Sequence, residues 1–334
     1  MTDPLPAAVA AVLAGQVRGG SRGALARAVT LVESTRVDHR AQARELVGLL
    51  AAAVRDDPPA VRIGLSGTPG AGKSTLIERL GGALTDRGHR VGVLAVDPSS
   101  PRTGGSVLGD KTRMPTLATD PNAYIRPSPT AGTLGGVTRA TAQAITVLEG
   151  AGYDVVIVET VGVGQSEAAV AQMVDSFVLL GLARAGDQLQ GIKKGVLEIA
   201  DVVAINKADG DRAVEARSAA GELAGALRLV RSGPDAWLPP VITCSGLTGD
   251  GLDRLWQAVL DHREHLGGVG LSNLRAEQRW ELVRALVRDD LDQRWARSAP
   301  VIALRDDVRA AVVRGELSAP AAADTLMAAF LGSS

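Results

Sequence analysis

The residues with the most evident chemistry form a glycine-rich run that ends in a lysine and a hydroxyl side chain. They are Gly67, Thr68, Pro69, Gly70, Ala71, Gly72, Lys73 and Ser74, followed by Thr75. The run fits G-x-x-x-x-G-K-[ST], in which backbone N–H groups surround phosphate, the lysine bridges the β- and γ-phosphates and the hydroxyl binds Mg²⁺. An apolar run precedes it and apolar residues at helical spacing follow, as a strand–loop–helix phosphate site requires. We therefore expect residues 67–75 to bind a nucleoside triphosphate.

A second motif, N-K-x-D, ends a later apolar run and indicates which base is bound. Its fixed positions are Asn206, Lys207 and Asp209. Guanine presents N1–H and its 2-amino group side by side, so one carboxylate can accept both, whereas adenine would leave that carboxylate unpaired. Asn206 would hold the loop and reach the base edge, and the Lys207 stem would lie along the ring. Ser245 and Gly246 follow the last apolar run, and a backbone N–H of this loop is expected to donate to O6 of guanine.

Three acidic residues are candidates for the magnesium shell. Glu159 begins an E-x-x-G pattern, in which its carboxylate would hold Mg²⁺ through water and the Gly162 N–H would contact the γ-phosphate. Asp97 ends another apolar run, and Asp110 lies in the glycine- and hydroxyl-rich loop after it. Both could ligate Mg²⁺ or orient the attacking water. The predicted catalytic residues are thus Lys73, Asp97, Asp110 and Glu159, and Ser74 joins the three carboxylates as a metal ligand.

Two further features bear on the rate of hydrolysis and its control. Val163 directly follows Gly162, and an apolar side chain cannot orient water, so we expect slow intrinsic turnover. Gln165 is displaced by two further positions. A loop with Gln190, Lys193 and Lys194 mixes glycine with charge and could contact phosphate or a partner protein, although adjacent lysines are as often merely solvated.

Composition narrows the class of protein. The chain has 334 residues, of which 46 % are hydrophobic and only 2 % aromatic, so its core must be Val, Leu, Ile and Ala. A net charge of −1 gives no electrostatic reason to expect nucleic-acid or anionic-membrane binding. Cys244 is the single cysteine and suits packing better than catalysis. Because no stretch reaches the ~18 apolar residues of a membrane span and Asp3 stands where a signal peptide is basic, we expect a cytoplasmic protein.

The pattern of apolar runs predicts an α/β fold. The candidate strands are Arg62–Ser66, Val91–Val96, Ala123–Arg126, Val155–Glu159, Ser176–Leu180, Val202–Asn206 and Pro240–Thr243. Several lack polar alternation, which is typical of strands buried on both faces of a mostly parallel sheet flanked by helices. Such a P-loop fold binds nucleotide at the carboxyl ends of its strands.

Breaks in this pattern divide the chain into three parts. We predict an N-terminal helical extension over residues 1–57, a P-loop domain over 58–262 and a C-terminal helical region over 263–334. The last contains an amphipathic helix, Arg275–Trp295, after a glycine-rich hinge at 267–270, and then two shorter helices. It is too small for its own core, so it must pack on the nucleotide domain or on a second subunit, and the long helix favours a homodimer.

Taken together, the motifs resemble those of the MeaB/ArgK GTPases, of the SIMIBI class of P-loop proteins. The resemblance rests on residues 67–74, 96–100, 102–106, 109–114, 159–167 and 190–195. It is dense from about 60 to 262 and weaker in both helical ends. It implies a homodimer that uses GTP, GDP and Mg²⁺ and that chaperones an adenosylcobalamin-dependent methylmalonyl-CoA mutase by gating cofactor loading and protecting the enzyme. The segment ending near Asp110, Glu159 and the loop with Lys193 and Lys194 would then respond to nucleotide and partner.

Two alternatives remain open. A metal-delivery GTPase of the same superfamily would need a site rich in His or Cys, and one cysteine with four scattered histidines offers no obvious one. His262 and His265 lie three residues apart on a predicted helix and are expected at the surface. A kinase linked to arginine/ornithine transport would use ATP, against which Asp209 argues.

Overall fold

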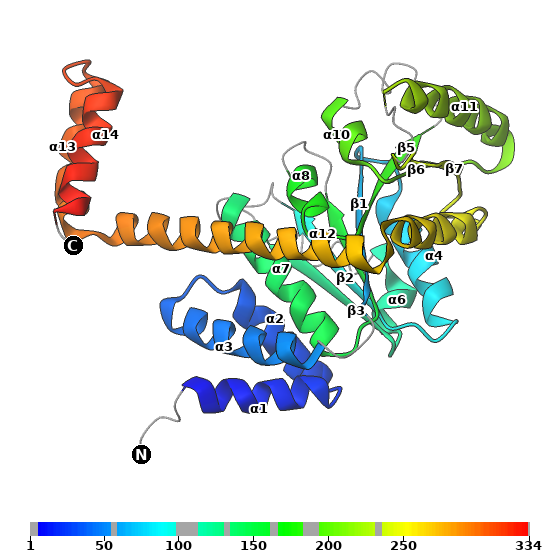
Figure 1. Ribbon diagram of the computed structural model, residues 1–334, viewed down its shortest axis with the longest axis horizontal. Helices are drawn as coiled ribbons and strands as arrows, with labels where there is room; N and C mark the ends of the chain where they lie inside the picture. Colours follow the sequence, from blue (N-terminus) through cyan, green and yellow to red (C-terminus); the bar gives the residue numbers. More distant parts are fainter. Residues whose placement is uncertain are drawn as a thin grey trace. The chain divides into compact units, whose positions relative to one another are not determined.

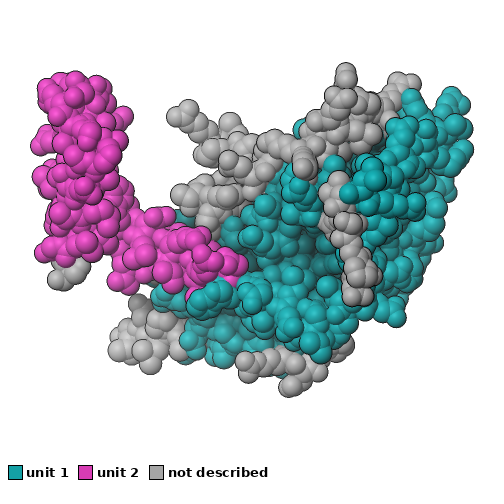
Figure 2. All heavy atoms as spheres, turned by 45° about the horizontal axis from the view of Figure 1, so that its top comes forward, with its two compact units in different colours: residues 1–280 teal, residues 281–334 magenta. Residues whose placement is uncertain are grey.

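The computed structural model describes residues 6–54, 59–97, 113–129, 134–160, 166–182, 194–230 and 236–332. The chain divides into two compact units, residues 1–280 and 281–334, which Figure 2 draws in different colours. The predicted three-part division at 57 and 262 is a different partition, and it stays a prediction. Within the described ranges, no helix is both long and apolar enough to cross a membrane.

The first unit is built on a seven-stranded sheet whose neighbouring strands all pair in parallel, in the order β3-β2-β4-β1-β5-β6-β7. The strands are β1 (Val61–Gly67), β2 (Val91–Asp97), β3 (Ala123–Pro129), β4 (Val155–Thr160), β5 (Ser176–Leu182), β6 (Val202–Asn206) and β7 (Val241–Thr243). These confirm the predicted strands and the predicted fold class. β3 continues past Arg126 because it is an edge strand, where proline residues are tolerated.

Helices cover both faces of this sheet. They are α1 (Pro6–Arg18), α2 (Arg22–Glu33), α3 (Val37–Val54), α4 (Lys73–Thr85), α6 (Pro115–Thr119), α7 (Leu134–Gly150), α8 (Ser166–Ala171), α10 (Lys194–Ile199), the 3₁₀ turn η1 (Gly210–Arg212), α11 (Ala213–Val230) and α12 (Leu252–Arg297). Alternate strand residues enter opposite layers: Val156 and Val158 lie in the cluster with α1, α2, α3, α7 and α11, whereas Val155 and Ile157 lie in the cluster with α4, α6 and α12.

The N-terminal helices extend this core and do not form a separate one. Leu46 and Leu50 of α3 are buried in the same cluster as Leu148 of α7, and Figure 1 shows α2 and α3 beside α7. α3 begins at Val37, one residue before Asp38. Its carboxylate stands in the first helical turn, where it complements the partial positive charge of the helix N-terminus.

Helix α12 consists of two helical segments that meet at Gly267, where the backbone is not helical, with φ 64° and ψ 175°. That left-handed φ favours glycine, and it falls where the sequence predicts a hinge. Before the break, Leu255 and Trp256 are buried against the sheet. After the break, the helix still belongs to the first unit, and its Arg275 is buried there.

Arg275 enters a buried cluster of charges at the amino ends of β1 and β5. Its guanidinium donates to Asp175 at 2.9 and 2.7 Å and to the Ala60 carbonyl at 2.6 Å. Asp175, 1 % exposed, also accepts the Arg62 backbone N–H at 3.0 Å. The Arg62 side chain in turn binds both Glu149 oxygens, at 2.6 and 2.8 Å. The cluster holds α12 against the amino ends of these strands, at the opposite end of the strands from the phosphate loop.

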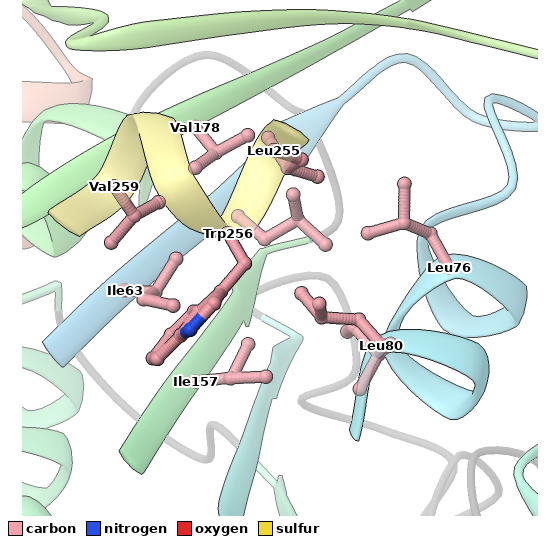
Figure 3. Close-up of a pocket in the computed structure, with 10 residues that line it drawn as sticks. Ile63, Leu76, Leu80, Ile157, Val178, Leu255, Trp256 and Val259 are labelled. Atoms are coloured by element: carbon pink, nitrogen blue, oxygen red, sulfur yellow. The ribbon is translucent and has the colours of Figure 1, made fainter. Parts of the chain in front are cut away.

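A small cavity of about 10 Å³ lies between α4, α12 and the sheet. Figure 3 shows Trp256 of α12 and Leu76 and Leu80 of α4 pointing toward this space from two sides. Apolar side chains line it, and water needs several polar partners to occupy a site of that size. The cavity is therefore a dry packing gap beneath the helix that follows the phosphate loop.

The second unit consists of the end of α12 together with α13 (Ala299–Val313) and α14 (Ala319–Leu331). The two short helices confirm the sequence prediction. Gly315, with φ 75°, lies in the turn between them. Apolar side chains on α12 at Val283, Val287 and Leu291 are exposed.

The buried charge cluster yields a stability prediction. Arg275→Leu should lower the free energy of unfolding by about 3 kcal/mol, because Asp175 would stay buried without its bidentate partner. The matched control is Arg284→Leu, which removes an exposed i,i+3 pair with Glu281 and should cost less than about 1 kcal/mol. Urea unfolding followed by circular dichroism measures both. Equal losses in the two variants would contradict the role of the cluster.

Candidate functional site

The lysine of the phosphate loop is held by the loop itself. Lys73 opens α4 and is 9 % exposed, and its Nζ donates to the Gly67 carbonyl at 2.7 Å and to the Thr68 carbonyl at 3.4 Å. Burial lowers the pKa of the ammonium below its ordinary value, while the carboxylates of Glu159 and Glu167 act to raise it. The ammonium is therefore held at the end of β1, where the charges of both carboxylates act on it.

Glycine is required where the phosphate loop meets the base loop. Gly72 has φ 91°, and a Cβ atom there would lie 2.7 Å from the Asn206 amide nitrogen. Gly70 also has a left-handed φ, 82°. Both conformations are costly for residues with a side chain, so the glycines of the motif permit the turn and the close approach of Asn206.

The hydroxyl and the carboxylate predicted to bind Mg²⁺ lie together. Ser74 Oγ donates to Glu159 Oε1 at 3.2 Å, from α4 to the end of β4. β2 pairs with β4 in a register that places Val96 beside Thr160, so the backbone of Asp97 reaches the same edge of the sheet. Hard oxygen donors are the ligands that Mg²⁺ prefers, and the pair fits that ion.

Asn206 joins the phosphate loop to the base loop. Its side chain is 2 % exposed, donates to the Ala71 carbonyl at 2.8 Å and accepts the Gly246 N–H at 3.0 Å. The next residue, Lys207, has φ 60°, the one positive φ outside glycine among the described residues. The strained backbone turns the chain so that Asp209 meets Ser245, whose hydroxyl donates to Asp209 Oδ1 at 2.7 Å.

The structure thus brings together Lys73, Ser74, Glu159, Asn206, Asp209, Ser245 and Gly246. Four predicted site residues lie outside the described residues: Asp110, Gly162, Gln190 and Lys193. The side chains of Asp97 and Lys194 are not described either. Their roles stay predictions.

Two features of the site were not identified from sequence. One is the buried Glu167, whose charge acts on Lys73 and which follows Glu159 by eight residues. The other is the double contact of Asn206 to both loops. An acidic residue soon after an E-x-x-G pattern was the available signal for the first, whereas contacts across 135 residues left no local signal for the second.

His262 corrects the expectation of a surface histidine. It is 5 % exposed, and its Nδ1 lies 2.8 Å from Ser176 Oγ, while the ring of Trp237 packs against it. His265 is exposed, as predicted. In the part of the chain that the structure describes, no three His, Cys, Asp or Glu side chains gather as a metal site would require.

The sequence of the chain is similar to a described protein family and to several known proteins. A family model described as methylmalonyl Co-A mutase-associated GTPase MeaB matches residues 25–299. A protein described as a probable GTPase from Mycobacterium tuberculosis is 57 % identical over 320 residues, covering 94 % of this chain and 93 % of the relative. A mouse protein described as a mitochondrial methylmalonic aciduria type A homolog is 47 % identical over 319 residues, covering 93 % and 77 %.

A solved structure described as a LAO/AO transport system kinase has the same fold. It superposes with a TM-score of 0.71 at 35 % sequence identity and covers 98 % of both chains. The shared architecture therefore includes the helical ends as well as the sheet.

Cys244 provides a test of the geometry beside the base loop. The thiol is 2 % exposed, and burial raises its pKa to about 12. We expect iodoacetamide at pH 8 to leave it unmodified in the native protein, because thiolate is the reactive form, and to modify it fully in urea. Mass spectrometry of the two samples measures this. Rapid modification of folded protein would contradict the described packing around Asn206.

Proposed function

The chain belongs to the MeaB family of GTPases, and from this premise we propose that it is a GTP-driven switch that chaperones an adenosylcobalamin-dependent methylmalonyl-CoA mutase. GTP hydrolysis itself follows from that membership. The observation that supports a mutase partner is the match over residues 25–299 to a family described as mutase-associated. The chaperone would gate cofactor loading and protect the mutase.

We propose that Lys73 changes its hydrogen-bond partner when the phosphates of the nucleotide bind. Its Nζ would exchange the Gly67 carbonyl for the β- and γ-phosphate oxygens, as the backbone N–H groups of the loop surround the β-phosphate. Burial favours this exchange, since a desolvated ammonium gains more from phosphate charge than from a neutral carbonyl.

Ser74 and Glu159 would hold Mg²⁺, with Asp97 and Asp110 as the remaining predicted ligands. When bound, the ion neutralises charge on the phosphates while the γ-phosphoryl group is transferred to water. Ser74 would then give up its bond to Glu159 and turn its oxygen toward the metal. The contact between these two residues therefore sets their spacing before GTP is engaged.

Asp209 would select guanine by accepting N1–H and the 2-amino group. The Asn206 bridge supports this role, because it fixes the base loop to the phosphate loop at a set distance. Gly246 already donates its N–H to Asn206, so a base oxygen would compete for that donor.

We also propose a homodimer that uses the C-terminal helices. Val283, Val287 and Leu291 recur at helical spacing on α12 and are exposed in the single chain. Burying such a stripe against its own copy is how a helix with one exposed apolar face is stabilised. Gln190, Lys193 and Lys194 would act in the response to nucleotide or partner.

Asp209→Asn tests the base assignment. We expect GDP affinity to fall by about 100-fold, because the amide offers one acceptor and a repelling donor where the carboxylate offers two acceptors. Competition against a fluorescent guanine nucleotide measures it, with unchanged thermal melting as the check on folding. Equal competition by ADP and GDP against the unaltered protein would rule out guanine selectivity and favour a kinase that uses ATP.

Turnover with and without the mutase tests the chaperone role. Because Val163 cannot orient water, we expect basal hydrolysis far below the rate on the order of 10 s⁻¹ that activated GTPases reach, and a rise when a methylmalonyl-CoA mutase is added. Phosphate release and co-purification provide the two readouts. A fast basal rate would contradict the role of Val163, and absence of both complex and rate change would contradict the mutase partner.

A further inference from the structure

Helix α6 is fixed to the helix of the phosphate loop by a single carboxylate. Glu78 of α4 accepts the backbone N–H of Thr116 at 2.8 Å through Oε1 and that of Leu117 at 3.2 Å through Oε2. The first turn of a helix leaves such donors without a partner inside the helix, and Pro115 at the start of α6 has no N–H. One side chain of α4 therefore fixes the amino end of α6.

Apolar packing holds α6 in the same place. Met114 and Leu117 are buried, in the cluster that also contains Ala71 of the phosphate loop. A Cβ atom at Gly81 of α4 would lie 2.7 Å from Leu117 Cδ2, so the absence of a side chain there makes room for α6. Figure 1 shows α6 beside α4. The backbone at residue 114 is consequently held against the helix that begins at the phosphate loop.

Arg113 directly precedes this anchored segment, and its side chain is exposed. Ser74 lies four residues before Glu78, one helical turn away on the same face of α4, so the anchor brings residue 113 close to the phosphate site. Burial is the main cause that lowers the pKa of the Lys73 ammonium, and the charge of Arg113 adds to it. Within the described ranges, the Arg113 guanidinium forms no hydrogen bond or ion pair.

The order of the strands indicates which end of the nucleotide this guanidinium meets. The base loop follows β6 and β7, on one side of β1 and its phosphate loop, whereas β4, β2 and β3 lie on the other side. α6 contacts both α4 and β3, so it belongs to this second side. A nucleotide with its base beside β6 and β7 directs its last phosphate away from them, toward β4, β2 and α6.

Two neighbouring cations suit a ligand with several negative charges. Lys73 and Arg113 repel each other, and this repulsion is relieved when phosphate binds between them. The guanidinium has a planar fork of donors that matches two oxygens of one phosphate group, whereas the ammonium acts as a compact charge. The two side chains therefore suit different contacts with the same polyphosphate.

We propose that Arg113 binds the γ-phosphate of GTP and that Glu78 is the positioning residue that holds it there through α6. This rests on the proposed contact of Lys73 with the β- and γ-phosphates. The guanidinium would donate to two γ-phosphate oxygens and place positive charge where the transition state spreads negative charge. GDP has no γ-phosphate, so Arg113 would distinguish the two nucleotides.

The experiment compares GDP with guanylyl imidodiphosphate, an analogue of GTP that resists hydrolysis, by competition against a fluorescent guanine nucleotide with Mg²⁺ present. Arg113→Gln should weaken binding of the analogue by about tenfold and change GDP binding by less than about twofold, because only the analogue has a γ-phosphate. Arg113→Lys keeps the charge without the fork and should recover part of the lost affinity. Equal losses for both nucleotides in Arg113→Gln, or no loss for either, would overturn the role of Arg113.

Arg79→Gln is the matched control on the same helix. Arg79 is exposed beside Glu78, and its guanidinium donates to the Thr248 carbonyl at 3.4 Å, in the turn that follows the base loop. The variant removes the same charge from α4 and leaves α6 unchanged. We expect both affinities to change by less than about twofold and their ratio to stay the same. A change of the ratio as large as that in Arg113→Gln would show a general charge effect and contradict a specific contact.

A double-mutant cycle tests the role of Glu78. Glu78→Gln keeps the size of the side chain but offers one acceptor oxygen for two N–H groups, so α6 and Arg113 would be held less firmly. We expect affinity for the analogue to fall by about threefold at unchanged GDP affinity, and no further fall when Glu78→Gln is added to Arg113→Gln. Additive losses would refute an action of Glu78 through Arg113. Thermal melting shows whether each variant is folded.

Lys73→Ala separates this proposal from the one on which it rests. Unchanged affinity for both nucleotides in that variant would refute phosphate binding by Lys73. A large loss in Lys73→Ala together with an unchanged ratio in Arg113→Gln would refute the role of Arg113 alone.

Discussion

The buried amide of Asn206 is the contact on which the site depends. An amide can donate and accept at once, and here it donates to the Ala71 carbonyl and accepts the Gly246 N–H. A carboxylate of the same size would repel the carbonyl, and an aliphatic side chain would leave both backbone groups unpaired in a buried position. The phosphate loop and the base loop are far apart in the sequence, and this one side chain sets the distance between them. Gly72 makes the approach possible because it has no Cβ.

Much of the fold was predictable because the strands are short apolar runs with breaks on either side, several of them rich in Val and Ile. The parallel sheet follows from the absence of polar alternation, and the phosphate loop follows from a motif whose spacing is fixed by its own backbone. The prediction was wrong where a tertiary contact overrides local pattern. His262 reads as a surface residue but is buried beside Ser176 and Trp237.

The residue types of the site could be predicted from the sequence, but the contacts between those residues could be predicted only in part. Lys73, Ser74, Glu159 and Asp209 were identified by motif because their ligands demand those side chains. Ser245 was expected to contribute a backbone N–H, yet its hydroxyl makes the contact with Asp209 across 36 residues of chain. Pairings of that kind depend on how β6 and β7 lie side by side, and no local spacing encodes them.

The charge cluster around Asp175 has a consequence for how the protein can be divided. Arg275 lies beyond the glycine break of α12, where the sequence suggests that the nucleotide domain has already ended. A shorter polypeptide that stops between the break and Arg275 would keep every nucleotide-binding motif but leave Asp175 and the Ala60 carbonyl without their main cationic partner. The smallest piece expected to express as a folded nucleotide-binding protein therefore carries part of the helix that leads to the second unit.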